Sequence, residues 1–443
     1  MSQSISFRNI WKVSLPIIFS GVAQNIVNVT DTAFMGRVGI TELGAAGNSG
    51  IFYFVLLVLG IGFTIGCQII IGRRNGEKNF QEIGSLFNTA LLFLLPLALI
   101  IFILVKLFSP FLLAELTSSA AILKASNAYL SIRIWGIFFA FVNFLFIAFF
   151  TGITETKVLT KATFLQAITN VILDYLLIFG IAGFPEMGIA GAALASVISE
   201  FVAFIYFFYF TRQKVDREKY QLYLKLKFTT KKLQRIMKVA FPIMLQNFMA
   251  LTSWLIFFMI IEQIGEKELA VSHIARSIYM VLMIPLFGFS SATSTLVSNV
   301  IGQGKQGLVL TLVKRVVILS LGCTLLFMPA LLFFPTAVLS IYTNNIELID
   351  ASYPVINVIC GSMLFFSVAY IVFSAVTGTG KTLISMGIEF SSIFIYLIGA
   401  YLIGVHFKMP LSIVWCSEFI YFTLMGGISI LYLKFGNWKN SIV

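Results

Sequence analysis

Charged residues are scarce in this chain. Of its 443 residues, 11% are Asp, Glu, Lys or Arg and 59% are hydrophobic, and the mean hydropathy is +0.98. A soluble globular domain carries about 25% charged residues, because its surface faces water. The shortage of charge therefore excludes a soluble domain. It predicts an integral membrane protein whose main surroundings are the lipid bilayer.

Cysteine and histidine are also scarce, with four and two copies. The cysteines lie inside apolar runs without C-x-x-C spacing, which excludes a disulfide framework and a zinc site, and we expect them to be small core residues. They are Cys67, Cys323, Cys360 and Cys416. His273 and His406 are too far apart in the sequence for a metal site or a histidine-based catalytic centre.

Catalytic motifs are missing as well. Neither H-E-x-x-H nor G-x-S-x-G occurs in the sequence. The segment TGTGKT (377–382) resembles the end of a phosphate-binding loop, but Ala375 stands where that loop requires glycine. The segment also follows an apolar run rather than a strand, so we interpret it as a turn between helices. The sequence predicts a protein that is not an enzyme and that holds no metal and no cofactor.

The net charge of +12 is concentrated in one segment, 211–238. Its ten cations are Arg212, Lys214, Arg217, Lys219, Lys225, Lys227, Lys231, Lys232, Arg235 and Lys238. In a membrane protein such a run fixes the topology by staying in the cytoplasm, and lipid headgroups are its second partner. We therefore expect no nucleic-acid partner.

Twelve apolar segments are long enough to cross a bilayer, which takes about 20 residues per helix. They are 10–36, 46–71, 86–108, 127–150, 159–182, 188–210, 239–262, 276–301, 314–341, 353–376, 383–404 and 410–433. With an even number of spans and the basic segment inside, both termini face the cytoplasm. This orientation leaves 23 of the 30 Lys and Arg residues on the cytoplasmic side, as the positive-inside rule requires.

The two halves of the chain repeat each other. WKVSLP (11–16) recurs as MKVAFP (237–242), and TGITET (151–156) recurs as TGTGKT, in both cases 226 positions later. Six spans in each half give the repeats the same orientation. We therefore predict two six-helix lobes, 1–210 and 239–443, joined by a cytoplasmic linker at 211–238 and related by a pseudo-two-fold axis along the membrane normal. Transporters built in this way bind substrate between the halves.

Five acidic residues fall inside the predicted spans: Asp31, Asp174, Glu200, Glu389 and Glu418. An ionisable side chain in a membrane costs a few kcal/mol, so each is a candidate functional residue. For the three glutamates the sequence leaves a functional and a structural role open.

The two aspartates belong to polar stripes. The stripes are Gln24, Asn28 and Asp31 in the first span, and Gln166, Asn170 and Asp174 in the fifth. The spacing places each set on one helix face. Both aspartates precede the outer end of their span by about two turns, so they should lie at similar height. Because a polar stripe in lipid is unfavourable, we expect the stripes to face each other or a water-filled cavity.

The corresponding stripes of the second half carry no carboxylate, but methionines and aromatic residues are abundant there. Most of these are expected to pack normally, while a few could form a pliable wall for apolar molecules of different shapes. Our candidates for the substrate cavity are Gln166, Gln246, Trp254, Met259 and Met283.

Three stretches resemble the multidrug and toxic-compound extrusion (MATE) transporters: VTDTAFMGRVG (29–39), NVILDYLLIFG (170–180) and GIAGAALAS (188–196). The likeness covers essentially the whole chain, and the DTAF-x-G-R form looks most like the bacterial branch related to DNA-damage-inducible protein F. The resemblance implies a carrier of the cell inner (cytoplasmic) membrane whose lobes open alternately to either side. It would export amphipathic, often cationic, small organic molecules in exchange for protons or sodium.

The resemblance also carries over to individual residues. Asp31 and Gln24 match the family's first-span acid and glutamine, and Asn170 and Asp174 match its fifth-span pair. Some branches have further acids in spans 7 and 10, but the matching stretches 242–254 and 362–378 hold none. We therefore predict that coupling resides in the first half.

The predicted cation-coupling site consists of Asp31 and Asp174, with Gln24, Asn28 and Asn170 completing its hydrogen bonding. Protons are the expected coupling ion, and sodium is the alternative. Another possibility is a flippase for lipid-linked sugars, but it should need arginines deep in the cavity, whereas Arg133 and Arg276 are predicted near the outer ends of spans. An assembly scaffold is a further alternative. One chain is expected to be sufficient, so we predict a monomer.

Overall fold

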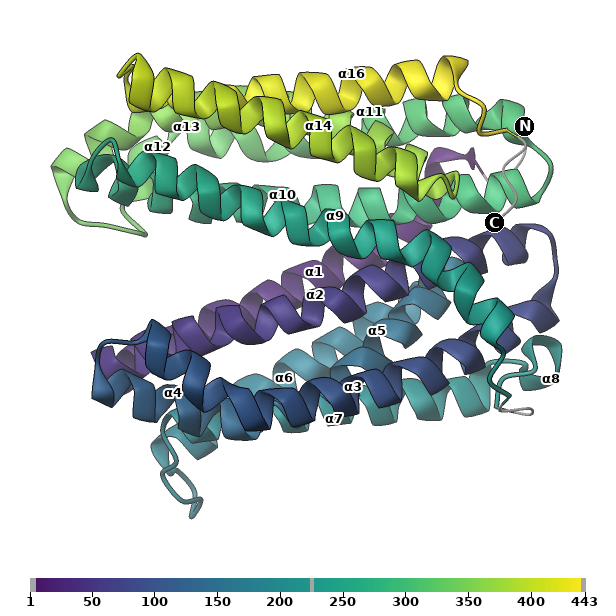
Figure 1. Ribbon diagram of the computed structural model, residues 1–443, viewed down its shortest axis with the longest axis horizontal. Coiled ribbons are helices and arrows are strands. Elements are labelled where there is room, and N and C mark those ends of the chain that lie inside the picture. The colour runs from purple at the N-terminus through teal and green to yellow at the C-terminus, as the bar shows by residue number, and fades with distance from the viewer. Residues whose placement is uncertain (1–4, 224–226, 440–443) are drawn as a thin grey trace. The chain divides into compact units, whose positions relative to one another are not determined.

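The computed structural model describes residues 5–223 and 227–439, and these ranges form helices and connecting turns without a strand (Figure 1). Lys225 of the basic segment lies outside the described residues, as does the side chain of Arg217. The helices up to the basic segment are α1 (Phe7–Val38), α2 (Ile40–Gly76), α3 (Phe80–Leu116), α4 (Ala120–Arg133), α5 (Gly136–Gly152), α6 (Lys157–Phe179), α7 (Ile189–Lys214) and α8 (Arg217–Tyr220). Those after it are α9 (Thr230–Glu262), α10 (Glu266–Gly302), η2 (Gln306–Leu308), α11 (Val309–Phe333), α12 (Pro335–Leu339), α13 (Ile346–Gly378), α14 (Thr382–Tyr401), η3 (Leu402–His406), α15 (Leu411–Trp415) and α16 (Ser417–Phe435).

The described helices account for the predicted spans. Eleven are long and apolar enough to cross a membrane, or twelve if α4 and α5 form one span bent by 53°. The prediction of an all-α membrane protein is therefore confirmed. Three spans differ from the prediction. The fourth, expected as one helix over 127–150, begins at Ala120 and is interrupted after Arg133. The ninth, expected over 314–341, ends at Phe333 and is followed by the separate helix α12, and the twelfth, expected over 410–433, is divided into α15 and α16.

The described chain divides into two compact units. The N unit is Phe19–Met244, and the C unit is Met1–Ile18 together with Leu245–Val443. Helices α1 and α9 are therefore each shared between the units. The boundaries after residues 18 and 244 are 226 positions apart, which is the spacing of the sequence repeat. The predicted lobes, 1–210 and 239–443, are defined as the parts that move during transport. Their limits stay a prediction.

The backbone repeats with the same spacing. Helices α4 and α13 begin after Ser119 and Asn345, 226 positions apart, and each of these side chains accepts a hydrogen bond from the first turn of its helix. Such caps satisfy N–H groups that a helix start leaves free. Three pairs of turn residues at this spacing have positive φ: Lys78 and Gly304, Thr154 and Gly380, and Ala182 and Lys408. The TGITET and TGTGKT segments thus form equivalent turns between helices, as predicted.

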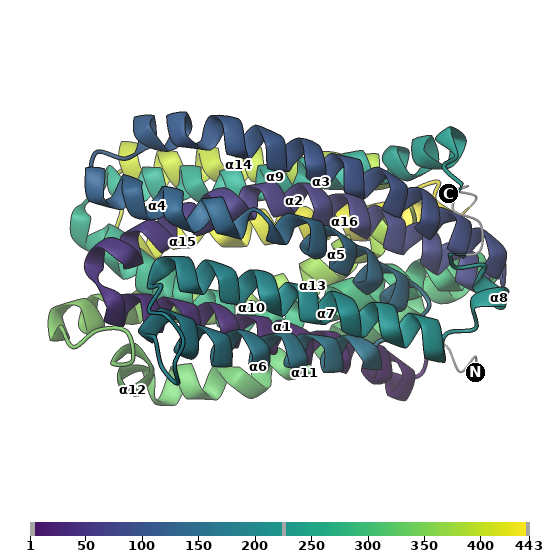
Figure 2. The ribbon, with the colours of Figure 1, turned by 90° about the horizontal axis from the view of Figure 1, so that it is seen from below.

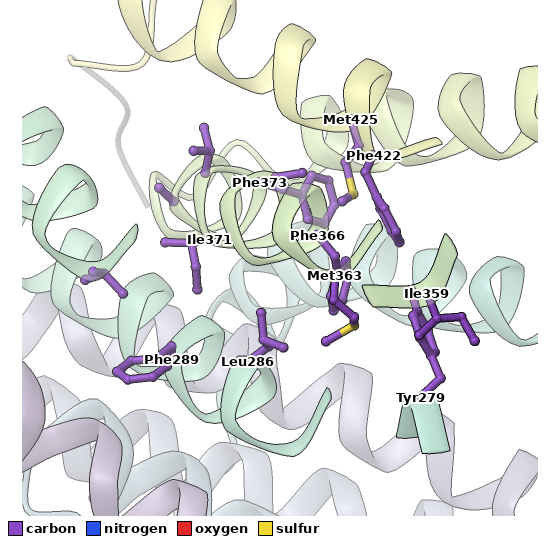
Figure 3. Packing of buried hydrophobic residues seen from close by; sticks show 14 of the residues in the cluster. Tyr279, Leu286, Phe289, Ile359, Met363, Phe366, Ile371, Phe373, Phe422 and Met425 are labelled. Carbon is purple, nitrogen blue, oxygen red and sulfur yellow. The ribbon is translucent and has the colours of Figure 1, made fainter. Parts of the chain in front are cut away.

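Within the N unit, α7 packs against α6, and α5 packs against α2 (Figures 1 and 2). In the C unit, α16 packs against α14, and α13 packs against α10. These are the same contacts in the two repeats. An apolar cluster fills the C unit, and Figure 3 shows Met363 and Phe366 of α13 close to Tyr279 of α10 and Phe422 of α16. Helices α14 and α16 therefore lie side by side in the C unit.

Candidate cation site

Asp31, Asn170 and Asp174 lie together in the N unit. Asn170 and Asp174 are on α6, one turn apart, and both are fully buried; Asp31 is on α1 and half-buried. The Asn170 amide is assigned with its nitrogen towards the aspartates, because its oxygen would otherwise face only acceptors. In this orientation Asn170 Nδ2 donates to Asp31 Oδ1 at 3.0 Å and to Asp174 Oδ2 at 3.2 Å. One amide thus joins two carboxyl groups from different helices.

The two carboxyl groups are also within hydrogen-bonding reach of each other. Two negative charges this close repel strongly in a buried site, so a pair of acids shares one proton or binds one cation. Asp174 Oδ1 is buried and has no hydrogen-bond partner among the described residues, which leaves an acceptor free for either ion. Chemically, the arrangement can hold one positive charge and release it.

Apolar side chains close the site along both helices. One to two turns before the aspartates, Ala23 and Val27 of α1 pack against Ala167 of α6. One turn after them, Met35 of α1 and Ile178 of α6 belong to a second buried cluster. Layers of this kind exclude water and strengthen every electrostatic interaction between them. The aspartates therefore form a short polar segment between two clusters of apolar side chains.

A close approach of α7 to α6 supports the site from the side. A Cβ atom added at Gly191 of α7 would lie 2.7 Å from the Leu177 carbonyl oxygen of α6, so only glycine fits there. Five residues along α7, the Ser196 hydroxyl lies 3.5 Å from the other end of the Asn170 amide. The close approach at Gly191 also brings Ser196 to the site.

Replacing Gly191 by leucine is expected to push α7 away from α6 and to lower the free energy of unfolding by about 1–3 kcal/mol. The thermal unfolding midpoint of the purified protein in detergent measures this effect. Gly387→Leu on α14 is the matched control, because a Cβ there meets nothing within 4 Å. Equal midpoints for the two variants would contradict the close packing of α6 and α7.

A second charged group lies in the same unit, at the interruption between α4 and α5. Arg133 donates to Glu200 on α7 through both terminal nitrogens, at 3.0 and 2.6 Å, and Arg133 Nη1 also donates to the Tyr53 hydroxyl at 3.2 Å. All three side chains are buried. A Cβ at Gly136 would overlap both charged groups, so this glycine makes room for the pair. Arg133 is also close enough to Asp31 to act on it electrostatically.

This pair changes two interpretations from the sequence. Arg133 was expected near the outer end of a span, but it is a buried partner of Glu200, whose role the sequence left open. Two hydrogen bonds from Arg133 compensate the buried charge of Glu200. The sequence did hold a signal for this pair. Arg133 is the one charged residue of the predicted fourth span and Glu200 that of the sixth, and opposite charges within a membrane tend to pair.

The other predicted site residues are more scattered. Gln24 and Asn28 are exposed on α1, and no hydrogen bond joins either side chain to the aspartates in the described part of the chain. The substrate-cavity candidates belong to both units. Gln166, in the N unit, is half-buried. In the C unit, Gln246 accepts a hydrogen bond from Ser385 at 3.4 Å, and Trp254 stacks on Phe258.

Two of the C-unit cavity candidates, Met259 and Met283, differ in exposure. Met259 is 53% exposed, whereas Met283 packs against the apolar core. A small pocket in the C unit is lined by Met363, Leu282, Phe327 and Met328 among others, and none of the five cavity candidates lines it. The proposed wall of the substrate cavity therefore stays a prediction.

Comparison with known proteins places the chain in a family. The model of the MatE family matches residues 16–176 and 242–402, one segment in each half. The chain is 28% identical over 443 residues to a protein of Thermotoga maritima named probable multidrug resistance protein NorM, covering 98% of this chain and 93% of that protein. It is 21% identical over 392 residues to the probable multidrug resistance protein YoeA of Bacillus subtilis, covering 86% of this chain and 84% of that protein.

The fold also matches solved structures. One is described as the outward-facing conformation of a multidrug resistance MATE family transporter of the MOP superfamily. It superposes with a TM-score of 0.90 at 18% identity, covering 97% of this chain and 95% of that one. The branch within the family stays a prediction. Because the family model covers both halves, the chain belongs to the MatE family of membrane transporters.

Proposed function

We propose that this protein is a secondary active multidrug transporter that exports amphipathic, often cationic organic compounds in exchange for protons. The observation that carries the proposal is the Asp31–Asn170–Asp174 group, in which a fully buried and a half-buried carboxyl group share one amide and need one positive charge. The names of the relatives, which are multidrug resistance proteins, support the substrate class.

In the proposed cycle, the aspartate pair takes up a proton from the outer side and releases it to the cytoplasm. With the proton bound, the carboxyl groups attract each other through a hydrogen bond. Without it, they repel, and α1 shifts against α6. A change in this contact is what would link proton binding to the substrate site. A membrane potential adds about 2.3 kcal/mol per charge per 100 mV to the driving force.

The proposal includes a topology. Both termini face the cytoplasm of a cell whose inner membrane the chain crosses, and the lobes 1–210 and 239–443 open alternately to either side. The distribution of Lys and Arg supports this orientation. One chain carries both predicted lobes and the aspartate pair, so we propose that the monomer is active.

Transport in proteoliposomes tests the proposal. The purified protein is reconstituted, a proton gradient or a sodium gradient is imposed, and movement of a fluorescent lipophilic cation such as ethidium is followed. We expect movement driven by the proton gradient in sodium-free buffer. If movement requires sodium, the coupling ion is sodium rather than the proton. No movement under either gradient would contradict the proposed transport.

A further inference from the structure

Two glutamates of the C unit have no cation beside them. Glu389 on α14 and Glu418 on α16 are each 4% exposed. Within residues 5–223 and 227–439, neither glutamate forms an ion pair. Glu200 of the N unit, in contrast, is paired with Arg133. An isolated ionised carboxylate in an apolar interior is so unfavourable that the group neutralises instead. Something other than a basic side chain must therefore compensate these two acids.

The contacts of Glu389 leave one oxygen free. Tyr421 on α16 donates its hydroxyl to Glu389 Oε1 at 2.5 Å. Glu389 Oε2 is buried without any hydrogen-bond partner in the described part of the chain. A buried acceptor without a partner loses its hydration and gains nothing in return. The simplest group that removes this deficit is a proton on the carboxyl itself.

Glu418 continues the same group of side chains. Its Oε2 atom accepts a hydrogen bond from Tyr279 of α10 at 3.3 Å, and Tyr396 of α14 also bonds to it. The rings of Tyr396 and Tyr421 are 5.5 Å apart. Each carboxyl group is therefore hydrogen-bonded to a tyrosine hydroxyl, and the rings of these two tyrosines lie next to each other.

The internal repeat shows how the two units differ at this place. Tyr279 is 226 positions after Tyr53, and Glu418 recurs in SEF (417–419) as Glu200 does in SEF (199–201). In the N unit, Arg133 lies between these two side chains and neutralises the glutamate. The position 226 residues after Arg133 is Ile359, which is fully buried in the apolar core. The glutamate and the tyrosine remain, but the arginine is replaced.

The remaining surroundings of the two acids hold tyrosines rather than charges. Tyrosines from all four packed helices face the pair: Tyr279 of α10, Tyr370 of α13, Tyr396 of α14 and Tyr421 of α16. Arg276 is the nearest cation along α10, but its guanidinium lies over the Phe258 ring. Aromatic rings pack closely around the acids. The ring centroids of Tyr421 and Phe422 are 5.1 Å apart, and those of Tyr396 and Phe257 are 5.5 Å apart. Among the described residues no third acid, cysteine or histidine joins the two glutamates to complete a metal site, so a proton is the fitting ligand.

We propose that Glu389 and Glu418, with the tyrosine hydroxyls bonded to them, form a second proton-binding site in the C unit, separate from the aspartate pair of the N unit. The site binds at least one proton on its two carboxyl groups, and the tyrosine hydroxyls hold these groups in place by hydrogen bonds. The proposal does not rest on the transport activity, because proton binding can be measured on the protein at rest.

Infrared spectroscopy tests the site, because a protonated carboxyl group has a carbonyl band that an ionised one lacks. The starting protein is Asp31→Asn/Asp174→Asn, from which the N-unit pair is removed. At neutral pH we expect this variant to retain a protonated carboxyl band that disappears on alkalinisation. Adding Glu389→Gln and Glu418→Gln should abolish the band. Glu347→Gln, at an exposed acid of α13, is the control and should leave it unchanged.

Tyr421→Phe is the second variant, because it keeps the ring and removes only the hydrogen bond to Glu389. We expect the carbonyl band to shift in this variant. The proposal is overturned if the Asp31→Asn/Asp174→Asn protein has no protonated carboxyl band at neutral pH, or if the band survives both glutamine substitutions. If the glutamine variants do not fold, an unshifted band in Tyr421→Phe overturns it.

Discussion

Replacing Asp174 with asparagine is expected to reduce proton-driven efflux to the level of protein-free liposomes. Asparagine has the shape of aspartate and can keep the contact with Asn170, but it can neither bind nor release a proton. Only one acid, Asp31, would remain at the site, and the shared proton of the pair would be lost. The measurement is ethidium movement in proteoliposomes under an imposed proton gradient.

The matched control for Asp174→Asn is Asp350→Asn, an exposed aspartate near the start of α13. It carries the same chemical change away from the pair and should transport like the unmodified protein. Asp31→Asn should behave like Asp174→Asn, because each removes one half of the same proton site. Normal rates in both aspartate variants, with normal amounts of folded protein, would show that the pair does not couple transport.

Replacing Arg133 with methionine is expected to lower the free energy of unfolding by about 3–5 kcal/mol, because it leaves Glu200 buried without its cation. The loss includes both hydrogen bonds to Glu200 and the one to Tyr53. Adding Glu200→Gln should recover much of this stability, since the buried charge is then gone as well. Thermal or denaturant unfolding in detergent measures all variants.

Arg37→Met provides the control for Arg133→Met, because Arg37 is exposed at the end of α1 and should change stability by no more than about 0.5 kcal/mol. The interaction between the two sites follows from the single variants and the double variant. If Arg133→Met unfolded at the same temperature as Arg37→Met, the ion pair would not stabilise the fold. If Glu200→Gln gave no recovery, the unpaired charge would not be the cause of the loss.

Much of this architecture follows from the sequence because a membrane permits few solutions. Each span has to satisfy its own backbone hydrogen bonds, so hydropathy predicts where the helices lie. It does not predict their full length: α3, predicted over 86–108, extends over Phe80–Leu116. The repeat of 226 positions recurs in the caps at Ser119 and Asn345 and in the turns at Thr154 and Gly380. The interruption after Arg133 was missed, because no proline or polar run marks it.

The candidate site could be predicted only in part. The i, i+4 spacing of Asn170 and Asp174 fixes them on one helix face, and the shared depth of the two spans brings Asp31 to them. Helical spacing could not exclude Gln24 and Asn28, because it gives the face of a residue but not its neighbour in another helix. Arg133 and Glu200 are 67 positions apart, so no local pattern could pair them.

The central claim is that the Asp31–Asp174 pair holds a proton that leaves when substrate binds. Proton release on adding ethidium to the purified protein in weakly buffered detergent solution tests it most directly. We expect the unmodified protein to release protons in proportion to the ethidium bound, and the Asp31→Asn/Asp174→Asn variant to bind ethidium without this release. Equal proton release by both proteins would contradict the claim.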